Sequence, residues 1–319
     1  MFDPPGLFFQ VDLSCRRYST SYHGLLGESA PERLRQEDIE LETKRRWWEW
    51  LLLLLFGAAA AGLAVVTVLR AGTAYHRAGE VHWTPDYGQV ELLPLLEKPS
   101  RTAEDYKILY AQTGLTPLGI EDLLAAGDIQ RILTIQENYF RDYTVQTSSF
   151  APFTCTQTID DRAAYTQLKN GDIIVSSSTF FSWFRCGHAA MMVDEATRTL
   201  VNAVEIGTDS ALDPIEEFGQ RANFMVLRPK LPQMVREQAA AYAREHLVGL
   251  PYSLTAGLLP GEEVVTATQC AHLVWYAYQQ FGVDLDATGG PLVTPRDLAT
   301  SPLVELVQTF GFDPQELWG

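Results

Sequence analysis

The chain has 319 residues, enough for one or two domains and a few appended segments. Hydrophobic residues make up 46% of it, as in ordinary globular proteins, and no segment repeats at the period of a solenoid. The formal net charge is −16, nearly all of it on residues 71–319, where lysine and arginine form no cluster. This charge argues against nucleic acid and against an anionic membrane surface as ligands of the main body.

An apolar segment near the N-terminus predicts a membrane anchor. No charged residue falls between Leu51 and Leu69, a length that can span a bilayer, and three tryptophans form an aromatic belt at its start: Trp47, Trp48 and Trp50. A cleaved signal peptide is the alternative, but this apolar run begins too far from residue 1 and is too long. We therefore predict one transmembrane helix over residues 47–70.

The charges around this helix predict its orientation. Lys44, Arg45 and Arg46 precede it, whereas only Arg70 and Arg77 lie close on the other side. The positive-inside rule then places residues 1–46 in the cytoplasm as a tail and residues 71–319 outside. We expect a single-pass protein of the cell membrane with an extracytoplasmic C-terminal domain, and a charged helix over 32–49 continuous with the anchor.

The chain beyond the membrane divides into three parts. Residues 71–100 hold several glycines and prolines and are predicted as a stalk. Residues 101–150 form a helical lead-in, with helical patterns over 102–111, 119–126 and 128–140. Residues 151–319 begin with strands, predicted at 173–175, 187–193, 200–204 and 224–227. Helices follow at 232–247, from Cys270, and at 294–298, which indicates an α+β domain.

Cys270 begins an amphipathic helix. The apolar positions after it recur on one face: Leu273, Val274, Ala277, Tyr278 and Phe281. Thr268 can cap this helix and Gly282 can end it. A thiol in the first turn lies among unpaired backbone N–H groups, which lower its pKa and make it a better nucleophile. A buried structural cysteine is the alternative reading of this position.

Several short motifs resemble those of the NlpC-type papain-like cysteine hydrolases. Gly-Leu-Pro-Tyr at 249–252, followed by Cys270 at the start of a helix, resembles their nucleophile half. Their base half is matched by Gly-Asp-Ile-Ile at 171–174, Gly187-His188 and Val-Asn-Ala at 201–203. Here the base half comes first, as in the circularly permuted, YiiX-like branch. The resemblance covers about residues 165–305, and it implies a circularly permuted papain-like fold.

A cysteine hydrolase needs a thiolate, an imidazole that moves its proton, and a polar group that orients the imidazole. Cys270 is the candidate nucleophile and His188 the candidate base, with a core histidine as the alternative for His188. The resemblance makes Asn202 the orienting residue, since its side-chain oxygen can accept the imidazole N–H. Glu205 is the rival, because the permuted branch often uses a carboxylate, but strand alternation would put it on the face opposite Asn202.

The oxyanion of the intermediate also needs donors. The backbone N–H of Cys270 would provide one, because a helix terminus leaves its donors free. Tyr252 matches a family tyrosine and would supply or support another, with a packing aromatic as the alternative. His272 points about 200° round the helix from Cys270 and is not expected to replace His188.

The remaining cysteines raise two further questions. Cys15 falls on the cytoplasmic side, whereas Cys155 and Cys186 could form a disulfide and leave Cys270 free. Zinc binding by Cys186-Gly187-His188 and Cys270-Ala271-His272 is a competing hypothesis. These pairs share a face on a strand but diverge on a helix, so we expect no metal and no cofactor.

The sequence therefore predicts a membrane-anchored, outward-facing cysteine amidase or peptidase. The resemblance implies amide substrates, and the anchor favours cell-wall peptides. Two alternatives stay open: an N-acyl lipid amidase or acyltransferase on the same fold, and a non-catalytic surface module with or without zinc.

Overall fold

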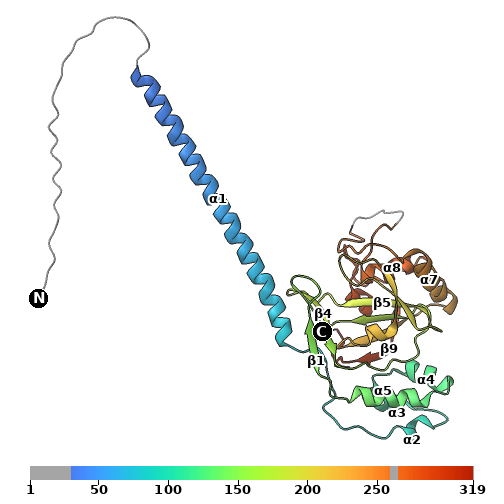
Figure 1. Cartoon of the computed structure of the whole chain (residues 1–319). Coiled ribbons are helices and arrows are strands. Elements are labelled where there is room, and N and C mark those ends of the chain that lie inside the picture. Colours follow the sequence, from blue (N-terminus) through green and yellow to red (C-terminus); the bar gives the residue numbers. More distant parts are fainter. Residues whose placement is uncertain (1–29, 259–264, 319) are drawn as a thin grey trace, which may run out of the picture. The chain divides into compact units, whose positions relative to one another are not determined.

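A computed structural model describes residues 30–258 and 265–318 (Figure 1). Cys15 and the first part of the predicted tail lie outside the described residues. The chain divides into two units, residues 1–63 and 64–319, and helix α1 (Ala30–Ala78) runs through the boundary.

Helix α1 confirms that the charged helix and the apolar segment are continuous. Ion pairs one turn apart, Lys44 with Glu40 and Arg45 with Glu49, support its charged part. Its apolar side chains, such as those of Leu53 and Leu54, are exposed. Among the described residues this is the one helix long and apolar enough to cross a membrane.

The second unit mixes helices and strands around a six-stranded antiparallel sheet. The strand order is β7-β6-β5-β3-β8-β9. The strands are β3 (Ile173–Ser176), β5 (His188–Asp194), β6 (Thr199–Asn202), β7 (Ala211–Pro214), β8 (Phe224–Pro229) and β9 (Val304–Phe310). The four predicted strands correspond to β3, β5, β6 and β8, whereas β7 and β9 were not predicted.

Three helices cover one face of this sheet. They are α7 (Gln233–His246), α8 (Cys270–Gln279) and α9 (Pro295–Thr300), and all three were predicted from the sequence. Alternate strand residues such as Val175, Ala189 and Met191 pack against the apolar sides of α7 and α8 in one buried cluster. The start of α8 is thereby held against β5.

The opposite face carries a second core of aromatic and aliphatic side chains. Tyr165, Phe224 and Phe218, the last from the short helix α6 (Ile215–Phe218), cover Ala190 and Met192 of β5. The lead-in helices build a third core among themselves. They are α2 (Leu93–Leu96), α3 (Ala103–Thr113), α4 (Pro117–Ala125) and α5 (Ile129–Tyr139). The last three agree with the predicted helical patterns to within a few residues.

A small second sheet joins this body to the end of α1. Its strands, in the order β1-β2-β4, are β1 (Val145–Ser148), β2 (Thr154–Ile159) and β4 (Thr179–Phe181). The segment after α1, predicted as part of a stalk, packs along the domain. Val81 N–H donates to Gln157 Oε1 at 2.9 Å, and Trp83 N–H to the Gly311 carbonyl at 3.0 Å.

A buried ion cluster ties the sheet to the lead-in helices. Arg228 on β8 donates Nε to Asp172 Oδ1 at 2.8 Å and Nη2 to Asp172 Oδ2 at 2.6 Å. Arg228 Nη1 also pairs with Asp122 of α4, to which Lys169 donates at 2.6 Å. Because Asp172 is fully buried, its negative charge depends on this guanidinium. The Gly-Asp motif that precedes β3 therefore has a structural role.

Candidate active site

Cys270 is the first residue of α8, and a side chain caps the helix just before it. Gln269, the N-cap residue, accepts the Ala271 N–H through Oε1 at 2.9 Å and donates Nε2 to the Val293 carbonyl at 2.7 Å. The prediction that Thr268 caps this helix is wrong. The Thr268 hydroxyl instead lies 3.2 Å from His272 Nδ1 in the core.

Backbone hydrogen bonds lay the Gly-Leu-Pro-Tyr segment beside the residues that precede Cys270. Thr268 N–H donates to the Pro251 carbonyl at 3.0 Å, and Ser253 N–H donates to the Thr268 carbonyl at 2.7 Å. Tyr252 is thus held close to the thiol. Burial raises the pKa of Tyr252, and the nearby Cys270 contributes to that rise, so this phenol stays protonated at neutral pH.

His188 and Asn202 are joined across neighbouring strands. Asn202 on β6 pairs in register with Ala190 of β5, so its side chain projects from the same face as that of His188. His188 Nε2 lies 2.7 Å from Asn202 Oδ1. The structure therefore places the predicted orienting residue in contact with the predicted base.

A third residue fixes the direction of this hydrogen bond. Asn202 donates Nδ2 to Oδ2 of Asp213 on β7 at 3.1 Å. An ionised carboxylate can only accept, so the amide must turn its NH₂ toward Asp213 and its oxygen toward His188. His188 then carries its proton on Nε2 and keeps a lone pair on Nδ1. A neutral imidazole with a free Nδ1 can act as a base.

The Cys270 thiol lies near the start of β5, beside the backbone of Ala189, the residue that follows His188. The backbone N–H of Ala189 is close enough to the Cys270 sulfur to favour the thiolate, as is that of Ala271. No direct hydrogen bond joins the Cys270 sulfur to the His188 imidazole within the part of the chain that the structure describes. The imidazole projects from the sheet face opposite α8, the face of Ala190 and Met192, and packs on the ring of Phe218 with centroids 5.6 Å apart.

Burial dominates the protonation of this pair. Cys270 is 6% exposed and His188 is 3% exposed. Burial raises the pKa of the Cys270 thiol, and the backbone N–H groups and Arg221 only partly offset this. The predicted lowering of this pKa is therefore wrong for the closed site. Burial, followed by Arg221, lowers the pKa of His188, so both groups are neutral at rest.

Arg221 is a member of this site that sequence reasoning missed. Its Nη1 donates to the Thr179 hydroxyl at 2.8 Å, and its guanidinium carbon lies 5.0 Å from the centre of the Phe218 ring. No carboxylate forms an ion pair with it within the described residues. Burial lowers the pKa of Arg221 to about 10, which leaves the side chain charged at neutral pH. A lone arginine before a strand gave no signal in the sequence.

Asp213 was also missed, although its strand is adjacent to β6. The short edge strand β7 follows an irregular turn and lacks a clear alternating pattern, so no strand was predicted there. The antiparallel pairing of Leu200 with Asp213 brings the carboxylate alongside Asn202. Only that pairing, and not the sequence spacing, relates the two residues.

Glu205 and His272 lie in different settings from the catalytic candidates. Strand β6 ends at Asn202, so Glu205 falls in the following turn, where the alternation argument does not apply. The Glu205 carbonyl accepts a bond from the Thr208 hydroxyl at 2.8 Å. His272 is buried beside Trp275, and burial lowers its pKa to about 4. It is a neutral core histidine.

Gly187 allows the backbone to turn into β5 immediately before His188. Its φ of +67° lies in the left-handed region, and a Cβ there would come within 2.6 Å of the Ser176 carbonyl oxygen. No other residue fits at this point without moving β3. The Gly-His motif thus has a steric reason.

The three cysteines among the described residues, Cys155, Cys186 and Cys270, are free thiols. Cys155 is buried, Cys186 is partly buried, and the two are not joined by a disulfide. Burial raises the pKa of Cys186 to about 12. No group of three or more potential metal-binding side chains occurs within the described residues.

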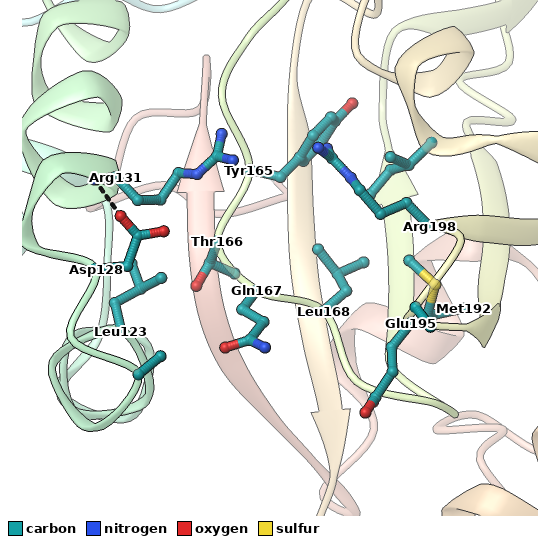
Figure 2. A pocket seen from close by; sticks show the side chains of 13 residues that line it. Leu123, Asp128, Arg131, Tyr165, Thr166, Gln167, Leu168, Met192, Glu195 and Arg198 are labelled. Atoms are coloured by element: carbon teal, nitrogen blue, oxygen red, sulfur yellow. Dashed lines mark hydrogen bonds between the residues drawn. The ribbon is translucent and has the colours of Figure 1, made fainter.

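A separate cavity of about 300 Å³ lies between the lead-in helices and the sheet. Figure 2 shows Arg131 of α5 and Arg198 on opposite sides of it, with Thr166 and Leu168 between them. The candidate triad residues do not line this cavity. It is therefore distinct from the site around Cys270.

Comparison with known proteins found no matching family model, no matching curated protein and no matching solved structure. The case for a function thus depends on the arrangement of these side chains.

Proposed function

We propose that the protein is a membrane-anchored cysteine hydrolase with a circularly permuted papain-like domain. Cys270 is its nucleophile, His188 its base and acid, and Asn202 the residue that orients His188. One observation carries the proposal: Asn202, itself held by Asp213, orients the imidazole of His188 so that Nδ1 keeps its lone pair. His188 begins β5, and the backbone N–H of the next residue, Ala189, faces the Cys270 sulfur.

The reaction requires the thiol and the imidazole to come together at the start of β5, because Cys270 packs on the α8 face of the sheet and the imidazole packs on Phe218 at the other face. The Cys270 thiol rotates toward His188, gives its proton to Nδ1, and its sulfur attacks the carbonyl carbon of the substrate. The tetrahedral intermediate collapses to a thioester, and the leaving amine takes the proton from Nδ1. A water molecule then loses a proton to Nδ1 and attacks the thioester, which releases the acid and restores the thiol.

The developing oxyanion would meet donors at the start of α8. The N–H of Cys270 is in the first turn of the helix, where such groups lack intrahelical partners. The N–H of Ala189 and the protonated phenol of Tyr252 are close to the same sulfur. Substrate entry requires the side chains over the buried thiol to move, and hydration of the open site would lower the thiol pKa.

Cell-wall peptides are the substrate class favoured by an outward-facing anchored domain, with no cofactor involved. An N-acyl lipid amidase or acyltransferase is the second candidate, favoured by exposed aromatic side chains beside the end of α1. Protease treatment of intact cells tests the orientation: it should remove residues 71–319 and spare the N-terminal tail. If the C-terminal domain is protected from the protease, the orientation is the opposite of the one proposed.

Trapping of the acyl-enzyme tests the chemistry. The purified full chain is incubated with cell-wall peptides and with N-acyl amides, quenched in acid, and analysed by peptide mass spectrometry. An acyl adduct on the peptide that contains Cys270 is expected, but not in Cys270→Ala. Cys186→Ala serves as the control thiol variant and should retain the adduct. Turnover that persists in Cys270→Ala would refute the proposal.

A further inference from the structure

Four exposed aromatic residues form a patch at one end of the small sheet. Phe181 ends β4, Trp183 and Phe184 lie in the turn that follows, and Phe150 is at the turn between β1 and β2, with 41% to 60% of each residue exposed. These residues are called the aromatic tip. Because β2 pairs Thr154 with Phe181, the two turns share one end of the sheet. Large apolar side chains grouped on a surface indicate a contact.

The aromatic tip is fastened to the last part of α1. The indole Nε1 of Trp183 donates to the Val68 carbonyl at 3.0 Å, and its ring lies 5.7 Å from that of Tyr75. The two backbones approach closely, because a Cβ on Gly72 would come within 2.7 Å of Ser182. Figure 1 shows β1 and β4 beside this end of the helix.

The position of Val68 in the sequence gives the depth of this contact. Val68 belongs to the uncharged run that starts at Leu51 and ends before Arg70. As a helix, that run is roughly 28 Å long, close to the thickness of a hydrocarbon core. If the run spans the bilayer, Val68 lies within about one turn of the membrane boundary. Trp183, which bonds to it, lies at the same level.

We propose that the aromatic tip inserts into the membrane beside α1 and forms a second membrane contact of the domain. Tryptophan favours this interface, since its ring is apolar and its N–H polar. Arg77, which bonds to Ser149, and the exposed Arg185 flank the aromatic rings, where they meet lipid phosphates. The acidic body does not oppose this contact, because the rings bind through burial and not through charge.

This contact fixes how the catalytic end of the domain faces the bilayer. Phe184 and His188 are so close in sequence that their Cα atoms are at most about 14 Å apart. If the proposed hydrolase function holds, the site around His188 opens near the lipid headgroups. A substrate held by the membrane, such as the amide of an N-acylated lipid, then reaches it without leaving the bilayer.

Photo-crosslinking to lipid tests the membrane contact directly. The full chain is reconstituted in phosphatidylcholine vesicles that contain a phospholipid with a diazirine high on its acyl chain. After irradiation, peptide mass spectrometry should find lipid adducts on residues 149–153 and 181–185 as well as on α1. The peptide that contains Phe281, an exposed aromatic residue elsewhere on the domain, should carry none.

The double variant Phe181→Ser/Phe184→Ser is a matched test, because both rings are exposed and their loss leaves the core intact. Adducts on 181–185 should fall at least fivefold, whereas those on residues 51–69 should not change. Adducts confined to α1 would overturn the proposal. Labelling of Cys270→Ala should equal that of the wild type, so a failure of the hydrolase assignment leaves this test unaffected.

Discussion

Asn202 donates its amide Nδ2 to Asp213 at 3.1 Å, and so presents its oxygen to the imidazole of His188. Asp213 thereby positions the imidazole of His188 indirectly, through Asn202. Asp213→Ala should lower kcat roughly tenfold to a hundredfold, the range for a lost hydrogen bond to a charged group, and leave KM nearly unchanged. Steady-state kinetics with a substrate identified by acyl trapping measures both constants.

Asp209→Ala is the matched control, because Asp209 is an exposed carboxylate in the preceding turn. It should keep wild-type kcat. A pH profile separates positioning from folding, since only a change in the orientation of His188 alters the shape of the acid limb. Equal losses in both variants would contradict a positioning role of Asp213.

Asn202 and Glu205 compete for the third place in the triad. Asn202→Ala should reduce kcat, because the imidazole loses the acceptor at 2.7 Å that holds its tautomer. Glu205→Gln should have little effect, since Glu205 lies in the turn beyond β6. Both variants are assayed at equal stability. A larger loss in Glu205→Gln would mean that the carboxylate is the orienting group.

Arg221 should set the reactivity of the thiol. Its positive charge favours the thiolate of Cys270 and opposes the rise in pKa that burial causes. Arg221→Gln should therefore raise the pKa of Cys270 further and slow its alkylation at neutral pH. The iodoacetamide rate of Cys270, followed by peptide mass spectrometry across pH, measures the shift. Arg244→Gln, at an exposed arginine that pairs with Asp194, should leave the rate unchanged.

Breaking the buried pair of Asp172 and Arg228 should lower the free energy of unfolding more than breaking an exposed ion pair does. Arg228→Met leaves the fully buried Asp172 carboxylate without its partner and should cost about 3–5 kcal/mol of unfolding free energy. Arg141→Met breaks an exposed pair with Asp161 and should cost less than about 1 kcal/mol. Urea unfolding of both variants gives the comparison, and similar midpoints would contradict the burial argument.

His272 should make the domain acid-sensitive. Its pKa is about 4 in the folded state and near 6.5 when unfolded, so the unfolded chain binds the proton more readily between these values. Its contribution to stability is complete above pH 6.5 and is lost as the pH falls toward 4, by about 3 kcal/mol at the limit.

His272→Phe removes this titration and keeps an aromatic ring beside Trp275. Thermal melts of wild type and variant should then differ in their pH slope between pH 6.5 and 4. Parallel slopes would show that His272 does not titrate with the fold.

The sequence alone determined the elements that local periodicity specifies. The long apolar helix, α7, α8 and the strands β3, β5, β6 and β8 were predicted, because amphipathic or apolar patterns and flanking Gly and Pro are local signals. The motifs also nominated His188, Asn202 and Cys270, and the hydrogen bond between His188 and Asn202 follows from neighbouring strands. Their catalytic roles remain predictions.

Tertiary structure decided the rest. Asp213 and Arg221 enter the site through strand pairing and side-chain packing, which have no fixed sequence spacing. The sign of the Cys270 pKa shift was predicted wrongly, because the helix terminus is visible in the sequence but the desolvation that outweighs it is not. The aromatic tip likewise became a surface only when β2 paired with β4 and Trp183 met Val68. Burial and long-range contacts depend on the whole packed chain, and short segments of sequence cannot encode them one by one.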